Sequence, residues 1–165
     1  MLLSVILDVI RKDSIGYEMK IIQLTENKKQ YLDLLLLADE QESMIDRYLE
    51  RGDMFVLNDN GVKAICVVTD ENDRVCELKN IAVTPEFQRQ GYGMRMINHL
   101  FTLYSGKYNQ MIVGTGDVPS TVGFYKSCGF EYSHRIENFF TDNYGHQIIE
   151  DGVLLKDMIY LRREI

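Results

Sequence analysis

The chain has 165 residues and a mass of 19.2 kDa, enough for one domain with a real hydrophobic core but short for two. Its net charge of −7 argues against a general nucleic-acid-binding protein, which needs a basic face. No stretch approaches the ~18 consecutive apolar residues of a membrane-spanning helix, so we expect neither nucleic acid nor membrane as a partner.

Cysteine usage and the first residues bear on the compartment and on the domain boundary. Cys66, Cys76 and Cys128 are too few and wrongly spaced for a disulfide framework or a zinc site, which favours the cytoplasm. The apolar start of the chain lacks the basic region and cleavage site of a signal peptide. A strand-like pattern begins at Met19. We therefore expect residues 1–18 to be an N-terminal extension and residues 19–165 to be the domain.

The pattern of apolar residues predicts a regular series of elements. Alternating or continuous apolar runs indicate strands, and apolar residues at intervals of three and four indicate helices. Asn58 to Gly61 is a hairpin turn, because Asn and Gly tolerate positive φ. The expected helices are 31–38, 42–51, 91–104 and 120–128. The expected strands are 19–24, 54–57, 63–69, 75–83, 111–113, 130–140 and 154–161. This order predicts an α+β or mixed α/β domain around one sheet.

The segment from Gln88 to Met94 lies between a predicted strand and an amphipathic helix. Unpaired N–H groups and the positive end of the dipole make a helix N-terminus an anion site. Gly91 and Gly93 would let a phosphate approach those N–H groups, and Arg89 adds further donors. A simple turn before a helix is the plainer alternative. The upstream Gln and Arg favour a phosphate-binding loop.

The spacing in this segment excludes two familiar phosphate sites. A Walker loop requires Gly-Lys-Ser/Thr, which the chain lacks. A Rossmann fingerprint requires a third glycine, and position 96 is Met. The loop is therefore of another kind.

Residues 77–101 resemble the acetyl-CoA-binding motif of the GNAT superfamily of N-acetyltransferases. The signature Gln/Arg-x-x-Gly-x-Gly/Ala appears here as Gln88-Arg89-Gln90-Gly91-Tyr92-Gly93, preceded by Leu78 to Pro85. Phe124 to Phe130 resembles the second signature, an aromatic-Tyr pair followed by Gly-Phe. Weaker similarity covers 19–165.

The resemblance implies a single GNAT-like domain with acetyl-CoA as co-substrate. Its central, mostly antiparallel sheet would have six to seven strands, splayed between the fourth and fifth and flanked by helices. Pantetheine would pair with the backbone of Ile81 and Val83, and the N–H groups of 89–94 would hold the pyrophosphate. The expected cofactor-binding residues are Ile81, Ala82, Val83, Gln88, Arg89, Gln90, Gly91, Tyr92, Gly93 and Met94.

Two catalytic residues are implied by the same resemblance. Tyr125 lies where the superfamily often has a general acid for the departing thiolate, although it could simply pack its helix onto the sheet. Glu77 lies where several members place a general base, because an amine must be neutral to attack. An exposed strand-edge carboxylate is an equal alternative for Glu77, and its neighbour Lys79 is expected to be solvated.

Other positions depart from the superfamily or stay open. Many relatives carry an Asn where this chain has Val118, and Ser120 or Thr121 could supply a hydroxyl in its place. The three histidines, including His134, show no metal spacing. Phe139, Phe140 and Tyr144 could form a homodimer contact, an acceptor wall or ordinary core, with the dimer contact slightly favoured.

The sequence therefore predicts an acetyl-CoA-dependent N-acetyltransferase that acts on a small-molecule or peptide primary amine by direct attack on the thioester. The alternative is a non-catalytic domain that binds or senses acyl-CoA. The presence of both Tyr125 and Glu77 favours the enzyme.

Overall fold

The computed structural model describes residues 18–165, so the prediction for the N-terminal extension lies almost wholly outside the described residues. Contacts within the chain form two compact units. The first unit comprises the described residues up to Thr69 together with Asn80–Ser105. The second unit comprises Asp70–Lys79 and Gly106–Ile165. Strand β4 (Val75–Val83) runs through both units, so each is described by itself, with β4 as their common strand.

Four strands of the first unit follow one another along the chain. β1 (Lys20–Leu24) pairs antiparallel with β2 (Asp53–Asn58), and β2 pairs antiparallel with β3 (Val62–Asp70). The end of β4 completes the order β1-β2-β3-β4. The predicted hairpin between β2 and β3 is confirmed, since Asn60 and Gly61 adopt positive φ of 52° and 107°.

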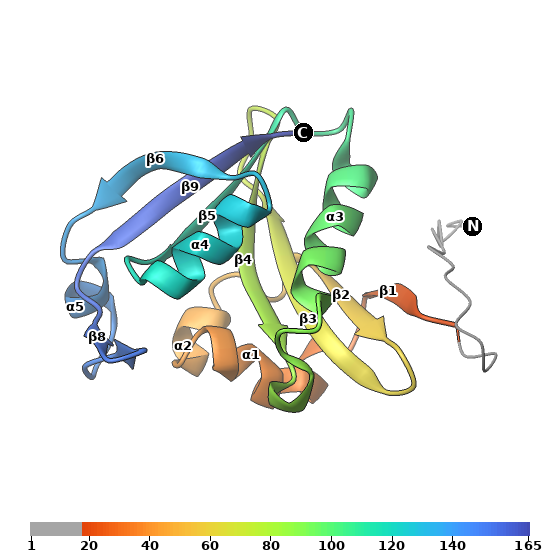
Figure 1. Ribbon diagram of the computed structural model, residues 1–165, viewed down its shortest axis with the longest axis horizontal. Coiled ribbons are helices and arrows are strands. Elements are labelled where there is room, and N and C mark those ends of the chain that lie inside the picture. The colour runs from red at the N-terminus through yellow and green to blue at the C-terminus, as the bar shows by residue number, and fades with distance from the viewer. Residues whose placement is uncertain (1–17) are drawn as a thin grey trace. The chain divides into compact units, whose positions relative to one another are not determined.

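The helices of the first unit cover both faces of these strands (Figure 1). They are the 3₁₀ helix η1 (Lys28–Tyr31), α1 (Leu32–Ala38), α2 (Glu42–Ile45), the 3₁₀ helix η2 (Pro85–Phe87) and α3 (Tyr92–Tyr104). Successive side chains of a strand point to opposite faces. One face of β2 and β3 packs with α1, α2 and the turns after α2 in a core of Leu35, Ile45, Tyr48, Leu49, Met54, Val56, Ile65, Val67 and Ala82. On the opposite face, Phe55 contacts the rings of His99 and Tyr104 on α3.

The buried side of α3 includes only some of its apolar residues. Ile97, Leu100 and Tyr104 are buried, but Met94 is 37% exposed. Met96 and His99 are buried in its place. The sequence offers apolar residues over more than half of the helix surface, and contact with β2 selects the stripe that includes His99.

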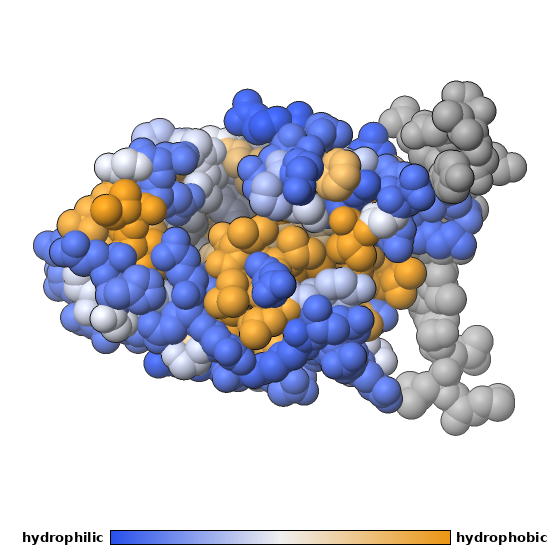
Figure 2. Space-filling model, turned by 90° about the horizontal axis from the view of Figure 1, so that it is seen from below, coloured by the Kyte–Doolittle hydropathy of each residue, from blue (hydrophilic) through white to orange (hydrophobic). Residues whose placement is uncertain are grey.

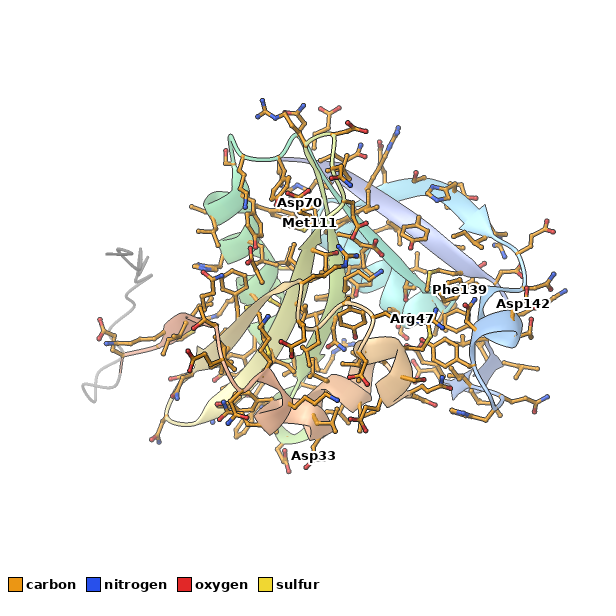
Figure 3. The ribbon with its side chains drawn as sticks, turned by 180° about the vertical axis from the view of Figure 1, so that it is seen from behind. Asp33, Arg47, Asp70, Met111, Phe139 and Asp142 are labelled. Carbon is orange, nitrogen blue, oxygen red and sulfur yellow. The ribbon has the colours of Figure 1, made fainter. Side chains whose placement is uncertain are left out.

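Helix α1 is apolar on nearly all sides, with Asp33 as its one charged residue. Leu35 is fully buried, whereas Leu37 is 51% exposed. Figure 2 shows apolar residues gathered on the face seen from below, and Figure 3 shows Asp33 pointing outward at that end of the first unit. Contiguous apolar surface of this kind is typical of a contact or binding face.

The strands of the second unit include one parallel pair. The start of β4 pairs parallel with β5 (Gln110–Gly116), which pairs antiparallel with β9 (Met158–Glu164). β6 (Glu131–Ile136) pairs antiparallel with β9 at the sheet edge, giving the order β4-β5-β9-β6. Since β4 is common to both runs, the sheet has seven strands and is mostly antiparallel, as predicted.

Pairing between the fourth and fifth strands stops early. The β4–β5 ladder runs from Val75↔Gln110 to Glu77↔Ile112. Both strands continue beyond it, β4 to Val83 and β5 to Gly116. This early end is the divergence expected between these two strands.

The second unit also contains α4 (Pro119–Ser127), α5 (Phe139–Asn143) and a two-stranded sheet of β7 (Ile149–Glu150) and β8 (Val153–Leu154). The strand predicted over 130–140 is wrong beyond Ile136. Asn138 adopts a positive φ of 57°, its N–H is held by the Asp157 carboxylate, and α5 begins at the next residue. The strand predicted over 154–161 is likewise interrupted: Leu154 ends β8, and β9 starts at Met158.

The aromatic residues of α5 and the segment after it belong to the core of the second unit. Phe140 is buried with Val118, Ile148 and Leu155, and Phe139, Tyr144 and Met158 pack against this cluster. Figure 3 shows Phe139 and Asp142 on α5. The packing of these rings supports ordinary core, the third of the three alternatives, rather than the slightly favoured dimer contact. Within residues 18–165, no helix is long and apolar enough to cross a membrane.

Candidate functional site

The predicted phosphate-binding loop joins η2 to α3 in the first unit. Arg89 and Gly91 adopt positive φ of 62° and 86°, and Gly91 is the N-cap of α3. A Cβ built on Gly91 would meet no atom within 4 Å, so the space beside this helix end is open. The first amides of an α-helix have no acceptor within the helix and suit an anion. The loop therefore fits a pyrophosphate group.

Three side chains of the predicted site hold the loop rather than extend from it. Gln88 donates to the Val83 carbonyl (3.2 Å) and Gln90 donates to the Glu86 carbonyl (3.2 Å). The Tyr92 hydroxyl donates to Asp59 Oδ2 (2.8 Å), on the turn between β2 and β3. An incoming phosphate would then meet the backbone and Arg89, which is exposed. Sequence reasoning missed Asp59, because the hairpin that carries it is remote along the chain.

The three predicted pantetheine-binding residues lie on β4 beyond the end of its ladder with β5. Ala82 is buried in the core cluster of the first unit, whereas Ile81 and Val83 are half-buried. Ala82 could therefore contact a ligand only through its backbone, because its side chain is buried. The Val83 carbonyl already accepts from Gln88, but a carbonyl oxygen has a second lone pair for another donor.

Glu77 lies in the second unit, at the last paired position of β4, and it is only 7% exposed. Its Oε1 accepts from the Tyr160 hydroxyl (3.1 Å) and from Lys79 Nζ (3.1 Å). The alternative of an exposed strand-edge carboxylate is therefore wrong. The expectation of a solvated Lys79 is also wrong, since this side chain forms an ion pair with Glu77 and is 24% exposed.

Tyr160 on β9 is the residue of this cluster that sequence reasoning missed. Burial and the neighbouring Glu77 carboxylate raise the pKa of Tyr160, so its hydroxyl stays protonated and donates. The alternation of Ile159, Tyr160 and Leu161 shows that Tyr160 faces away from its two buried neighbours. It could not have shown which strands would flank β9.

Tyr125 lies on α4 in the second unit and is buried among aromatic rings. Its ring centroid is 5.3 Å from that of Phe124 and 5.8 Å from that of Phe130. Burial raises the pKa of Tyr125, with the Glu150 carboxylate as a smaller cause. None of the residues 18–165 forms a hydrogen bond with the Tyr125 hydroxyl, and no described contact joins Tyr125 to Glu77. The ring packs, as the alternative required, and the hydroxyl remains available to a ligand.

The two hydroxyls that could replace the missing Asn side chain are both engaged. Ser120 Oγ donates to Asp151 Oδ2 (2.5 Å), and Thr121 Oγ1 donates to Glu150 Oε1 (2.6 Å). Val118 itself is buried in the core. The start of α4 is thus tied to the β7–β8 hairpin.

Comparison with known proteins agrees with this fold and these motifs. A family model described as "Acetyltransferase (GNAT) domain" matches residues 50–132, about half of the chain. The chain belongs to the GNAT acetyltransferase family. A GNAT family acetyltransferase from Elizabethkingia anophelis, solved with acetyl-CoA bound, is 33% identical with a TM-score of 0.84, covering 89% of this chain and 98% of that one.

This chain aligns with two further relatives over most of the length of each. A Bacillus subtilis acetyltransferase solved in complex with CoA is 27% identical with a TM-score of 0.81, covering 89% of this chain and 99% of that one. The Bacillus subtilis (strain 168) protein YvbK, described as an uncharacterized N-acetyltransferase, is 29% identical over 141 residues, which is 82% of this chain and 90% of YvbK. This GNAT chain is therefore an N-acetyltransferase with acetyl-CoA as co-substrate.

Proposed function

We propose that this enzyme transfers the acetyl group to a primary amine, on a small molecule or a peptide, which attacks the thioester directly. The observation that carries the proposal is the state of the Glu77 carboxylate. Both of its donors act on Oε1, and none of the residues 18–165 donates to Oε2. Glu77 is thus a buried, fixed carboxylate with one oxygen left to accept a proton.

Acetyl-CoA would bind along the first unit. The amides at the start of α3 and the Arg89 guanidinium would hold the pyrophosphate. The backbone of Ile81 and Val83 would pair with the pantetheine amides as an added strand does. Ala82, Gln88, Gln90, Tyr92, Gly93 and Met94 would shape this surface through their backbone.

The chemical step then needs three groups of the protein. Glu77 takes a proton from the amine, whose nitrogen forms the new bond to the carbonyl carbon. A backbone N–H near Val83 stabilises the oxyanion. The C–S bond breaks, and Tyr125 donates a hydrogen bond to the departing sulfur. Burial raises the pKa of Tyr125 further above that of a thiol. The phenol therefore keeps its proton and stabilises the thiolate by donating a hydrogen bond to it.

Release of CoA thiol tests this function. The protein is mixed with acetyl-CoA and a panel of amines, and each acceptor is confirmed by the mass of its acetylated product. Glu77→Gln should lower kcat by about a hundredfold, the usual range for a general base, and leave acetyl-CoA affinity unchanged. Tight CoA binding without turnover on any amine would instead support the non-catalytic binding domain.

A matched pair of variants tests the phosphate-binding loop. Asn and Asp have nearly the same shape and both tolerate the positive φ of Gly91. We expect Gly91→Asp to weaken acetyl-CoA binding at least tenfold more than Gly91→Asn, and we expect added salt to narrow the difference. Calorimetric titration measures both. Equal affinity of the two variants would refute the loop as the pyrophosphate site.

We also propose a cytoplasmic location and a homodimer for this enzyme. The three cysteines are buried and unpaired, as in a reducing compartment. β6 is an edge strand, and it carries exposed apolar side chains at Tyr132 and Ile136. An exposed apolar edge suits pairing with a second copy.

A further inference from the structure

The ring of Tyr160 reaches Glu77 across an intervening strand. Tyr160 on β9 is paired with Gly114 on β5, and Glu77 on β4 is paired with Ile112 of the same β5. The Tyr160 hydroxyl nevertheless lies 3.1 Å from Glu77 Oε1. The side chain therefore lies over β5 and joins the strands on either side of it.

A glycine on β5 makes this crossing possible. A Cβ at Gly114 would lie 3.0 Å from Cζ and 3.2 Å from Cε1 of Tyr160, and 2.6 Å from Met158 Sδ. The backbone of Gly114 does not have a positive φ, so its conformation does not require glycine. Glycine weakens a strand interior and often marks the close approach of another group. Here the groups that approach are the Met158 sulfur and the Tyr160 ring.

The other side of β9 also restrains this ring. His134 on β6 is paired with Tyr160, and their rings stack with centroids 4.8 Å apart and planes 6° apart. The His134 ring is itself within hydrogen-bond distance of Ser133 Oγ (3.0 Å). Tyr160 thus has Gly114 on one neighbouring strand and a stacked imidazole on the other.

We propose that Tyr160 is a positioning residue for Glu77, with Gly114 giving its ring room and His134 holding the ring by stacking. The inference rests on the proposed role of Glu77 as the base. Tyr160 and Lys79 fix Oε1, which turns Oε2 toward the acceptor amine. A hydrogen bond donated to a carboxylate also favours its ionised form, the form that can accept a proton.

Tyr160→Phe tests the inference, because it keeps the ring and removes the donor. We expect kcat to fall about tenfold, the worth of a hydrogen bond to a charged group, with acetyl-CoA affinity unchanged. The acid limb of the kcat/KM profile should move to higher pH, since a carboxylate that loses a hydrogen-bond donor is less favoured in its ionised form. The profile is measured with two acceptor amines of different basicity. A limb that belongs to the enzyme stays at the same pH with both amines, whereas titration of the amine moves with its basicity. Tyr132→Phe, on exposed β6, is the control and should change neither quantity.

The groups that could titrate near Glu77 are Lys79 on β4, Tyr160 on β9, Glu71 on the turn before β4 and, behind the Tyr160 ring, His134 on β6. His134→Phe keeps an aromatic ring stacked on Tyr160 and removes the imidazole, so the effect of Tyr160→Phe on the acid limb should persist in that background. His134→Ala should lower kcat by loosening the ring. Gly114→Ala should shift the acid limb as Tyr160→Phe does, because the added Cβ would displace the Tyr160 ring.

An acid limb that is the same in Tyr160→Phe and the unaltered enzyme would overturn the inference. The result is separable from failure of the proposed function. Full turnover in Glu77→Gln would remove the base itself, whereas impaired Glu77→Gln beside normal Tyr160→Phe would leave the base and remove only its positioning by Tyr160.

Discussion

The Tyr125 side chain combines a packed ring with a hydroxyl that none of the residues 18–165 engages. Tyr125→Phe should therefore leave stability unchanged, because the ring contacts remain. We expect kcat to fall ten- to a hundredfold, the worth of about 1.5–3 kcal/mol for a hydrogen bond to a charged sulfur. Steady-state rates at saturating acetyl-CoA, with thermal unfolding alongside, check this. An unchanged rate would leave Tyr125 as a packing residue only.

His99 gives the first unit a pH-dependent stability. Burial on α3 against Phe55 lowers the pKa of His99 below its usual 6.5. Below pH 6.5, His99 therefore binds a proton more readily in the unfolded chain than in the folded chain, and the free energy of unfolding falls as the pH decreases. Urea unfolding at pH 7.5 and 5.5 should show this loss, and His99→Phe should reduce it. An equal loss in both proteins would assign the effect to other groups.

At the scale of elements, a buried lysine holds the turns that follow the second helix. Helical geometry was expected over 42–51, but α2 ends at Ile45 and the chain continues in turns. Lys28 Nζ donates to the carbonyls of Leu49 (2.9 Å), Glu50 (3.1 Å) and Gly52 (2.7 Å). A buried ammonium from η1 thus satisfies the carbonyls where the turns meet β2. No local pattern in 42–51 could have revealed a donor from a preceding element.

Lys28→Met should destabilise the fold by about 3 kcal/mol, because several buried carbonyls lose a charged donor. The methionine side chain fills most of the space of the lysine butyl chain. The loss of stability therefore measures the missing donor rather than a cavity. Chemical denaturation measures it. Lys29→Met is the matched control: its exposed ion pairs with Glu42 and Asp46 should contribute little. Equal effects of the two variants would contradict the role given to Lys28.

Elements whose boundaries depend on neighbouring residues were predicted well. The Asn-Gly turn between β2 and β3 and the start of α3 after Gly91 are set by local φ preferences, and both are confirmed. The β6 boundary was missed because Asn138 meets the carboxylate of Asp157, which follows it by nineteen residues. Side-chain contacts between remote segments decide such ends.

At the scale of the whole molecule, the assembly is open to direct measurement. Sedimentation equilibrium should give twice the chain mass of 19.2 kDa if the edge strand β6 pairs with a second copy. Tyr132→Lys places a charge on the exposed edge, where Tyr132 is 54% exposed, and should shift the equilibrium toward the single chain. A single-chain mass for the unaltered protein would refute the dimer.

The family and the order of most elements could be read from the sequence, and so could the expectation of a phosphate-binding loop between Gln88 and Met94. These follow from periodicity, turn chemistry and two motifs, all written in neighbouring residues. The burial of Glu77, its ion pair with Lys79 and the reach of Tyr160 over Gly114 became visible only in the folded chain. The reason is physical: burial and hydrogen-bond partners depend on which strands become neighbours, and β4, β5 and β9 are far apart along the chain.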